Sequence, residues 1–124
     1  MEFDHFNITA PIEILERVKT FYCQVFDLEV GVRPNFSRAG FWLYAPSNPS
    51  TAIIHLTESA HELDSSQQGY LNHLAFKLSN LSPFEQKLKA MTISYKKSKV
   101  PDTTRIQLFF TDPVGTRLEA IFEE

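Results

Sequence analysis

One order of predicted secondary structure occurs twice along the chain, and this repeat limits the folds available to it. In each half a strand is followed by a helix and then by three strands, as judged from the spacing of apolar residues. Each half also carries two candidate metal ligands. His5 and His55 are 50 residues apart in the first half, and His73 and Glu119 are 46 residues apart in the second. The repeat predicts an α+β fold made of two tandem βαβββ modules.

The first module is predicted to span residues 1–58. Pro11 stands where a helix can begin, because its fixed backbone angle suits the first helical turn. The apolar residues that follow recur at i, i+4 and i+7, which is typical of a helix packed on a sheet. The predicted strand, helix and three further strands lie at residues 2–8, 11–26, 28–33, 40–45 and 51–58.

The second module is predicted to span residues 70–124, after a polar linker at residues 59–69 that lacks periodicity. Ser82 and Glu85 have the spacing of a capping box, and Pro83 between them suits the first helical position. These residues predict that a helix begins with Ser82 as its cap. The strands of this module are predicted at residues 70–78, 93–100, 105–111 and 116–122.

The composition excludes several classes of function. At 124 residues the chain is predicted to be one domain, residues 1–124, which can bury a core without disulfides, and its single cysteine cannot form an internal bridge. A formal charge of -3 and a pI near 5.8 argue against a nucleic-acid partner, and no apolar run is long enough for a membrane span. The acidic start lacks the regions of a signal peptide, so we expect a cytoplasmic protein with a small-molecule substrate.

The candidate ligands fall on strand faces that could line one site. Side chains alternate across a strand, so each candidate lies opposite an apolar row that can pack on a helix. If the two halves curve towards each other, the four faces would form a metal-containing trough between curved mixed sheets. Three imidazoles and one carboxylate suit a divalent ion, and Zn, Ni, Mn, Co and Fe are all compatible with them.

Three polar residues are candidates for substrate contacts. Asn7 shares a strand face with His5, and Gln107 shares one with Arg105. Arg105, with the lysines of residues 96–99, could attract an anionic substrate. The same lysines are also typical of a sheet edge that resists pairing with another strand.

Aromatic residues are further candidates for substrate contacts. Trp42, with Phe41 and Tyr44 beside it, could form an apolar wall against which a flat or cationic small molecule binds. Most aromatic residues of the chain are expected to belong to the ordinary core.

Five segments, DHFNI, FYCQVFDLEVG, AIIHLT, LNHLAFK and DPVGTRLEAIFE, occur in this order over nearly the whole chain. Together they resemble the vicinal oxygen chelate superfamily of glyoxalases, fosfomycin-resistance thiol transferases, extradiol dioxygenases and bleomycin-binding proteins. The resemblance implies metal ligation by His5, His55, His73 and Glu119. It also implies a homodimer, although the residues are equally compatible with a site inside one chain and with a site shared between two.

The match to individual members of that superfamily differs at one ligand. Bacterial glyoxalase I is similar at AIIHLT but has glutamate where this chain has His55. The thiol transferases and dioxygenases use two histidines and one glutamate, which match His5, His73 and Glu119. His55 would then be an extra ligand or a group that carries a proton.

Three functions follow as hypotheses. The first is a glyoxalase-like lyase or isomerase for a small oxygenated compound or its thiol adduct, in which the metal stabilises an enediolate-type intermediate. Glu119, and as second choice His55, would move the proton. The second hypothesis is an extradiol-type dioxygenase, and the third is a binding or resistance protein for a small, antibiotic-like molecule.

Overall fold

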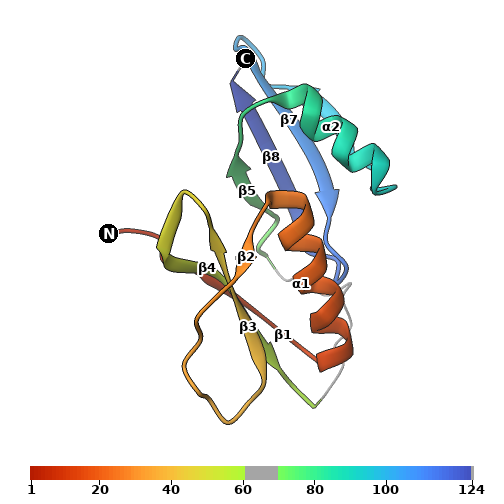
Figure 1. The fold of residues 1–124 in the computed structure, drawn as a ribbon. Helices are drawn as coiled ribbons and strands as arrows, with labels where there is room; N and C mark the ends of the chain where they lie inside the picture. The colour runs from red at the N-terminus through yellow and green to blue at the C-terminus, as the bar shows by residue number, and fades with distance from the viewer. Residues whose placement is uncertain (61–69, 124) are drawn as a thin grey trace. The chain divides into compact units, whose positions relative to one another are not determined.

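The protein, represented by a computed structural model, is described over residues 1–60 and 70–123. The chain divides into two compact units, Met1–Asp64 and Ser65–Glu124. Among the described residues, each unit has one helix and one mixed four-stranded sheet (Figure 1). The predicted α+β fold of two βαβββ modules is confirmed. Most of the predicted linker lies outside the described residues, and the trough between the modules stays a prediction.

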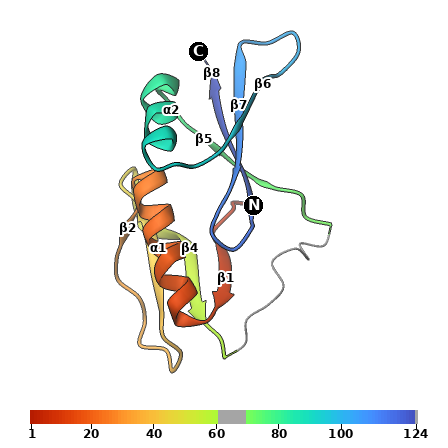
Figure 2. The ribbon, with the colours of Figure 1, turned by 90° about the vertical axis from the view of Figure 1, so that its right-hand side faces the viewer.

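In the first unit, helix α1 lies along one face of the sheet in both ribbon views (Figure 2). The strand order is β1-β4-β3-β2, with β1 parallel to β4 and the other pairs antiparallel. The buried helix side chains Leu15, Val18 and Tyr22 cover the apolar face of the central strand, where Ile54 and Leu56 are buried. The elements are β1 (Phe6–Ala10), α1 (Ile12–Phe26), β2 (Glu29–Val30), β3 (Gly40–Ala45) and β4 (Asn48–Glu58).

The second unit repeats this plan with the strand order β5-β8-β7-β6. Phe84 of the helix packs between Phe110 and Phe122, with ring centroids 6.1 and 5.6 Å away, which joins the helix to the two central strands. The lysine-rich strand lies at the sheet edge, as predicted. The elements are β5 (Leu74–Lys77), α2 (Leu81–Ala90), β6 (Lys96–Lys99), β7 (Arg105–Thr111) and β8 (Arg117–Glu123).

Several predicted boundaries were wrong. Both strands that open a module are shorter than expected at their beginning, because β1 pairs with β4 only from Phe6 and β5 pairs with β8 only from Leu74. His5 and His73 therefore precede these strands instead of lying within them. Strand β2 ends at Val30, because the chain then leaves the sheet, and β6 is confined to four residues.

The predicted cap of the second helix was also wrong. The cap is Asn80, which adopts a left-handed conformation with φ 68°, and its carbonyl accepts the backbone N–H of Phe84. Ser82 and Pro83 lie inside the first turn. A proline is tolerated there because the N–H groups of the first turn have no partner within the helix.

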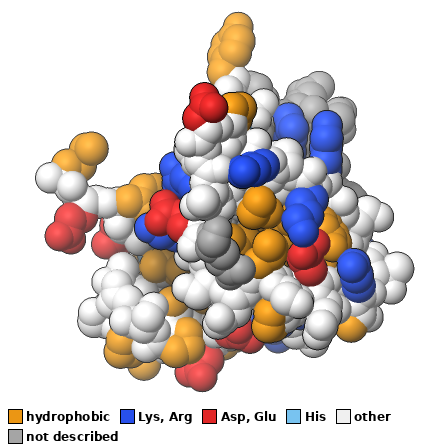
Figure 3. All heavy atoms as spheres, turned by 90° about the horizontal axis from the view of Figure 1, so that it is seen from above, with side chains coloured by type: hydrophobic (Ala, Val, Ile, Leu, Met, Phe, Trp, Pro, Cys, Tyr) orange, Lys and Arg blue, Asp and Glu red, His pale blue; other side chains and the backbone are white. Residues whose placement is uncertain are grey.

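Neither described helix is long and apolar enough to cross a membrane. The face of the protein in Figure 3 carries basic, acidic and apolar side chains side by side.

Candidate metal and substrate site

In the first unit, two candidate ligands and a tryptophan form a column of three rings. The ring of His55, on β4, lies between the rings of His5 and Trp42. Its ring centroid is 3.7 Å from that of His5 and 4.0 Å from that of Trp42, with interplanar angles of 13° and 12°. The sheet produces this arrangement, because Trp42 on β3 is the register partner of His55. The prediction that His55 lies opposite an apolar row of its strand is confirmed, because Ile54 and Leu56 on the other face are buried.

In the second unit, His73 and Glu119 lie together. The Nε2 atom of His73 is 3.7 Å from Oε1 of Glu119, which is too long for a hydrogen bond. Glu119 is 6% exposed in the middle of β8, and its Oε1 accepts a hydrogen bond of 3.0 Å from the amide of Gln107. Gln107 also accepts a bond from the hydroxyl of Ser98. The carboxylate is thus held by a chain of side chains that crosses β6, β7 and β8.

In both units, the side chain before the first candidate histidine contacts the Nδ1 atom of that histidine. Nδ1 of His5 lies 2.5 Å from a carboxylate oxygen of Asp4, and Nδ1 of His73 lies 2.7 Å from the side-chain oxygen of Asn72. The two acceptor oxygens favour the tautomer with its proton on Nδ1, in which the Nε2 atom keeps its lone pair. Metal-binding histidines are commonly oriented in this way.

These features allow a test of whether the residues fit a divalent metal. Imidazole nitrogens and a carboxylate oxygen are suitable donors, and two histidines have the outer hydrogen bond expected of ligands. Among residues 1–60 and 70–123, however, no group of three or more His, Cys, Asp or Glu side chains forms a metal site. Each unit brings two of the candidate ligands close together, and the donor types of the two pairs are those that suit a divalent ion.

His55 is also the candidate whose basicity the fold changes. Burial of the ring, with a smaller electrostatic contribution from His5, lowers the pKa of His55. A lowered pKa favours the neutral imidazole, which is the form that binds metal ions.

The structure places the predicted substrate residues in different surroundings. The side chain of Asn7 forms hydrogen bonds with those of Thr9 and Thr57, on the face of the sheet that carries His55. Arg105 lies near the end of the second sheet, with Nε 3.3 Å from a carboxylate oxygen of Glu123.

The three residues of the predicted aromatic wall have different surroundings. Phe41 lies under the ammonium group of Lys19, 4.7 Å from its ring centroid, on the helix side of the sheet. The hydroxyl of Tyr44 donates to the carbonyl of Val32. Trp42 lines a cavity of the first unit.

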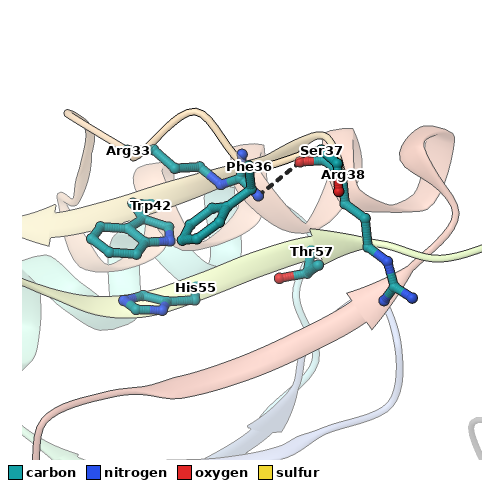
Figure 4. A pocket seen from close by; sticks show the side chains of 7 residues that line it. All are labelled: Arg33, Phe36, Ser37, Arg38, Trp42, His55 and Thr57. Atoms are coloured by element: carbon teal, nitrogen blue, oxygen red, sulfur yellow. Dashed lines mark hydrogen bonds between the residues drawn. The ribbon is translucent and has the colours of Figure 1, made fainter.

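The cavity has a volume of about 350 Å³ and lies beside the ring column in the first unit (Figure 4). It extends from the rings of Phe36, Trp42 and His55 past Thr57, and the arginines of the loop between β2 and β3 border it. The lining residues are Arg33, Phe36, Ser37, Arg38, Trp42, His55 and Thr57.

Sequence reasoning missed the contribution of this loop. Phe36 and Arg38 lie between two predicted strands, and Arg33 ends the predicted strand at residues 28–33, so the closeness of these three residues in sequence was the available signal. Functional side chains often lie on loops held by a rigid scaffold. The loop showed no periodicity, however, and its proline and asparagine indicated only a turn.

The chain matches a family model over residues 3–120, and the description of that family is the Glyoxalase/Bleomycin resistance protein/Dioxygenase superfamily. Comparison with curated protein sequences gave no match.

Solved structures resemble the whole chain. A protein assigned to the glyoxalase family from Bacillus anthracis has a TM-score of 0.76 and 21% identity over 100% of this chain and 96% of its own. A glyoxylase/bleomycin resistance protein/dioxygenase domain from Frankia has a TM-score of 0.74 and 20% identity over 100% and 93%. The TM-scores establish similarity of fold.

A third similar structure contains a metal. It is a mutant of the fosfomycin resistance protein FosX from Listeria monocytogenes in complex with Mn(II) and 1S,2S-dihydroxypropylphosphonic acid. Its TM-score is 0.74, with 14% identity over 99% of this chain and 92% of its own. A divalent metal is therefore compatible with the fold.

Proposed function

Because the chain belongs to the Glyoxalase/Bleomycin resistance protein/Dioxygenase superfamily, we propose that it is a metal-dependent lyase or isomerase acting on a small oxygenated molecule or its thiol adduct. The proposed metal ligands are His5, His55, His73 and Glu119. FosX, a structural neighbour, was crystallised with Mn(II), which supports a divalent metal for this fold. We further propose a homodimer, in which the ligands come from one chain or from two.

The observation that carries this proposal is the repeated pairing of ligands. In each unit, a histidine that directly precedes the first strand lies beside a ligand residue on the last strand. In each unit, the side chain before that histidine binds its Nδ1 atom and leaves Nε2 free. Hydrogen bonds of this kind are typical of histidines that bind metals, which supports the proposal.

The candidate residues have different roles in the proposed reaction. A bound divalent ion would supply Lewis acidity towards substrate oxygens. Glu119 is the candidate that can accept a proton from a carbon next to such an oxygen, and Gln107 holds the carboxylate in position. His55 borders the cavity and, with its neutral ring, is a second candidate for moving a proton.

Elemental analysis of protein purified without chelator tests the ligand set. The wild type should contain stoichiometric metal, and His5→Ala and Glu119→Ala should each lose metal affinity by more than the roughly 10- to 100-fold that outer-shell changes cost. Glu123→Ala, which removes an exposed carboxylate from the same strand, is the matched control and should retain the metal. Unchanged metal content in both ligand variants would refute the assignment.

Two assays separate the proposed activity from the alternatives. Oxygen uptake with a catechol, dependent on iron or manganese, would identify an extradiol-type dioxygenase. Tight binding of a small molecule that survives removal of the metal, without turnover, would identify a binding or resistance protein. The cavity beside Trp42 is the observation that favours this last candidate.

A further inference from the structure

The cavity of the first unit combines an aromatic wall with two guanidinium groups. Phe36 and Trp42 have ring centroids 6.2 Å apart at an angle of 46°, and His55 continues the wall by stacking on Trp42 (Figure 4). Arg33 lies over the ring of Phe36, with its guanidinium carbon 4.9 Å from the ring centroid. The Arg38 side chain extends past Thr57.

The positive charge of these arginines is not balanced nearby. Within residues 1–60 and 70–123, neither Arg33 nor Arg38 forms an ion pair with a carboxylate. Arg33 donates one bond of 3.0 Å from Nη2 to the carbonyl of Arg38, and its Nε atom is buried without an acceptor in the described part of the chain. The bond fixes Arg33 at the cavity but leaves its charge available.

The shape and the charge together indicate what the cavity can bind. An aromatic wall favours a flat, apolar group, since aromatic rings attract one another in offset-stacked or edge-to-face arrangements. Guanidinium groups favour oxyanions, which accept two hydrogen bonds from their planar fork. A neutral or cationic ligand would leave both charges uncompensated.

We propose that this cavity selects planar oxyanionic substrates, with a ring or conjugated group against Phe36, Trp42 and His55 and the oxyanion held by Arg33 and Arg38. Its description as a substrate cavity rests on the proposed function. The binding preference itself is a property of the first unit and does not depend on the metal.

Trp42 makes the binding measurable, because it is the single tryptophan of the chain and lines the cavity. Quenching of its fluorescence can be titrated with four probes: benzoate, phenylphosphonate, neutral benzamide and non-planar cyclohexanecarboxylate. Of benzoate and phenylphosphonate, the one that binds more tightly should bind roughly tenfold or more tightly than benzamide and cyclohexanecarboxylate. Benzamide lacks the negative charge and cyclohexanecarboxylate lacks the planar ring, and both properties contribute to binding. Equal binding of charged and neutral probes, or no quenching by any probe, would overturn the proposal.

Variants assign the charge to its residues. Arg38→Gln and Arg33→Gln should weaken binding of the aromatic anions several-fold and leave benzamide binding unchanged. Arg17→Gln, on the exposed surface of α1, removes the same charge and should have no effect. Arg38→Gln is the decisive variant, because Arg33 also bonds to the loop backbone. An unchanged affinity for anions in Arg38→Gln would overturn the assignment.

The same samples separate this inference from the proposed function. Titrations of chelator-treated protein should show the same preference for planar anions, whereas metal content is measured on the untreated protein. Selective anion binding without stoichiometric metal would refute the metal enzyme and keep the cavity assignment. Stoichiometric metal with no preference for anions would support the metal enzyme and refute the cavity assignment.

Discussion

At the scale of single residues, Gln107 connects the sheet to the chemistry of Glu119. Its amide donates to the buried carboxylate and its oxygen accepts from Ser98, so that both ends of the side chain are occupied. A buried carboxylate requires such donors, because hydrogen bonds replace the water it has lost. Gln107 was predicted to orient a substrate, whereas in the structure its amide is directed at the candidate ligand Glu119.

Replacing Gln107 with leucine should weaken metal binding by roughly 10- to 100-fold, as is typical when a residue that orients a ligand is lost. Competition with a chromophoric chelator measures the affinity. Ser98→Ala is the control, because it removes the outer bond and retains the one to Glu119. Wild-type affinity in Gln107→Leu would contradict a positioning role.

The residues also show what could be predicted from sequence at the site. His55 and Glu119 could be assigned to faces, because alternation along a strand fixes both faces at once. The bonds of Asp4 and Asn72 to the following histidines could not be predicted, since the backbone before each strand has no periodic pattern. The role of Arg33 and Arg38 depends on the path of a loop, which local sequence does not determine.

At the scale of elements, α2 is tied to the segment before β6 by side chains. The hydroxyl of Tyr95 donates to Oε1 of Glu85 at 2.8 Å, and Lys97 bonds to the other carboxylate oxygen at 3.1 Å. These contacts, led by the Tyr95 bond, lower the pKa of Glu85, and the same bond raises the pKa of Tyr95. The helix is thus joined to the edge strand of its sheet by charge as well as by packing.

Tyr95→Phe should lower the urea midpoint of unfolding at neutral pH. Because the folded state lowers the pKa of Glu85, the ionised carboxylate stabilises the fold above its unfolded pKa of about 4.3, and this contribution is lost as the pH falls through the folded pKa. The difference between Tyr95→Phe and wild type should therefore shrink in acid. Tyr70→Phe, which removes an exposed hydroxyl, is the control, and a pH-independent difference would contradict the ionic contribution.

Helices and central strands were the elements best predicted from sequence. The predicted helix at residues 11–26 is observed at Ile12–Phe26, and β7 has its predicted bounds, because long amphipathic patterns and buried alternation constrain both. The edge strands and the cap at Asn80 were predicted poorly. Their ends depend on pairing and on a left-handed residue, which apolar periodicity does not encode.

At the scale of the whole molecule, the proposed site takes one candidate ligand pair from each kind of unit. Zinc sites in proteins use three protein ligands when catalytic and four when structural, so a pair from one unit would not be sufficient by itself. The proposed site therefore needs both kinds of unit, from the same chain or from two chains of a homodimer.

Mixing two inactive variants distinguishes these arrangements. One variant carries His5→Ala and His55→Ala, and the other carries His73→Ala and Glu119→Ala. If the site is shared between chains, a mixed dimer regains one intact site, and metal binding returns when the variants are refolded together. If the site lies within one chain, the mixture binds no more metal than its components. Each variant refolded alone is the control.

The repeated pairing has an electrostatic consequence. The first unit brings two imidazoles and the carboxylate of Asp4 behind His5, and the second brings one imidazole and the carboxylate of Glu119. In the proposed site, the buried carboxylate of Glu119 would be the one negative charge in contact with the metal, because the Asp4 carboxylate is exposed and lies behind His5. A trivalent ion would therefore keep more uncompensated positive charge than a divalent ion, so electrostatics favours the divalent state of any metal that is able to change its oxidation state.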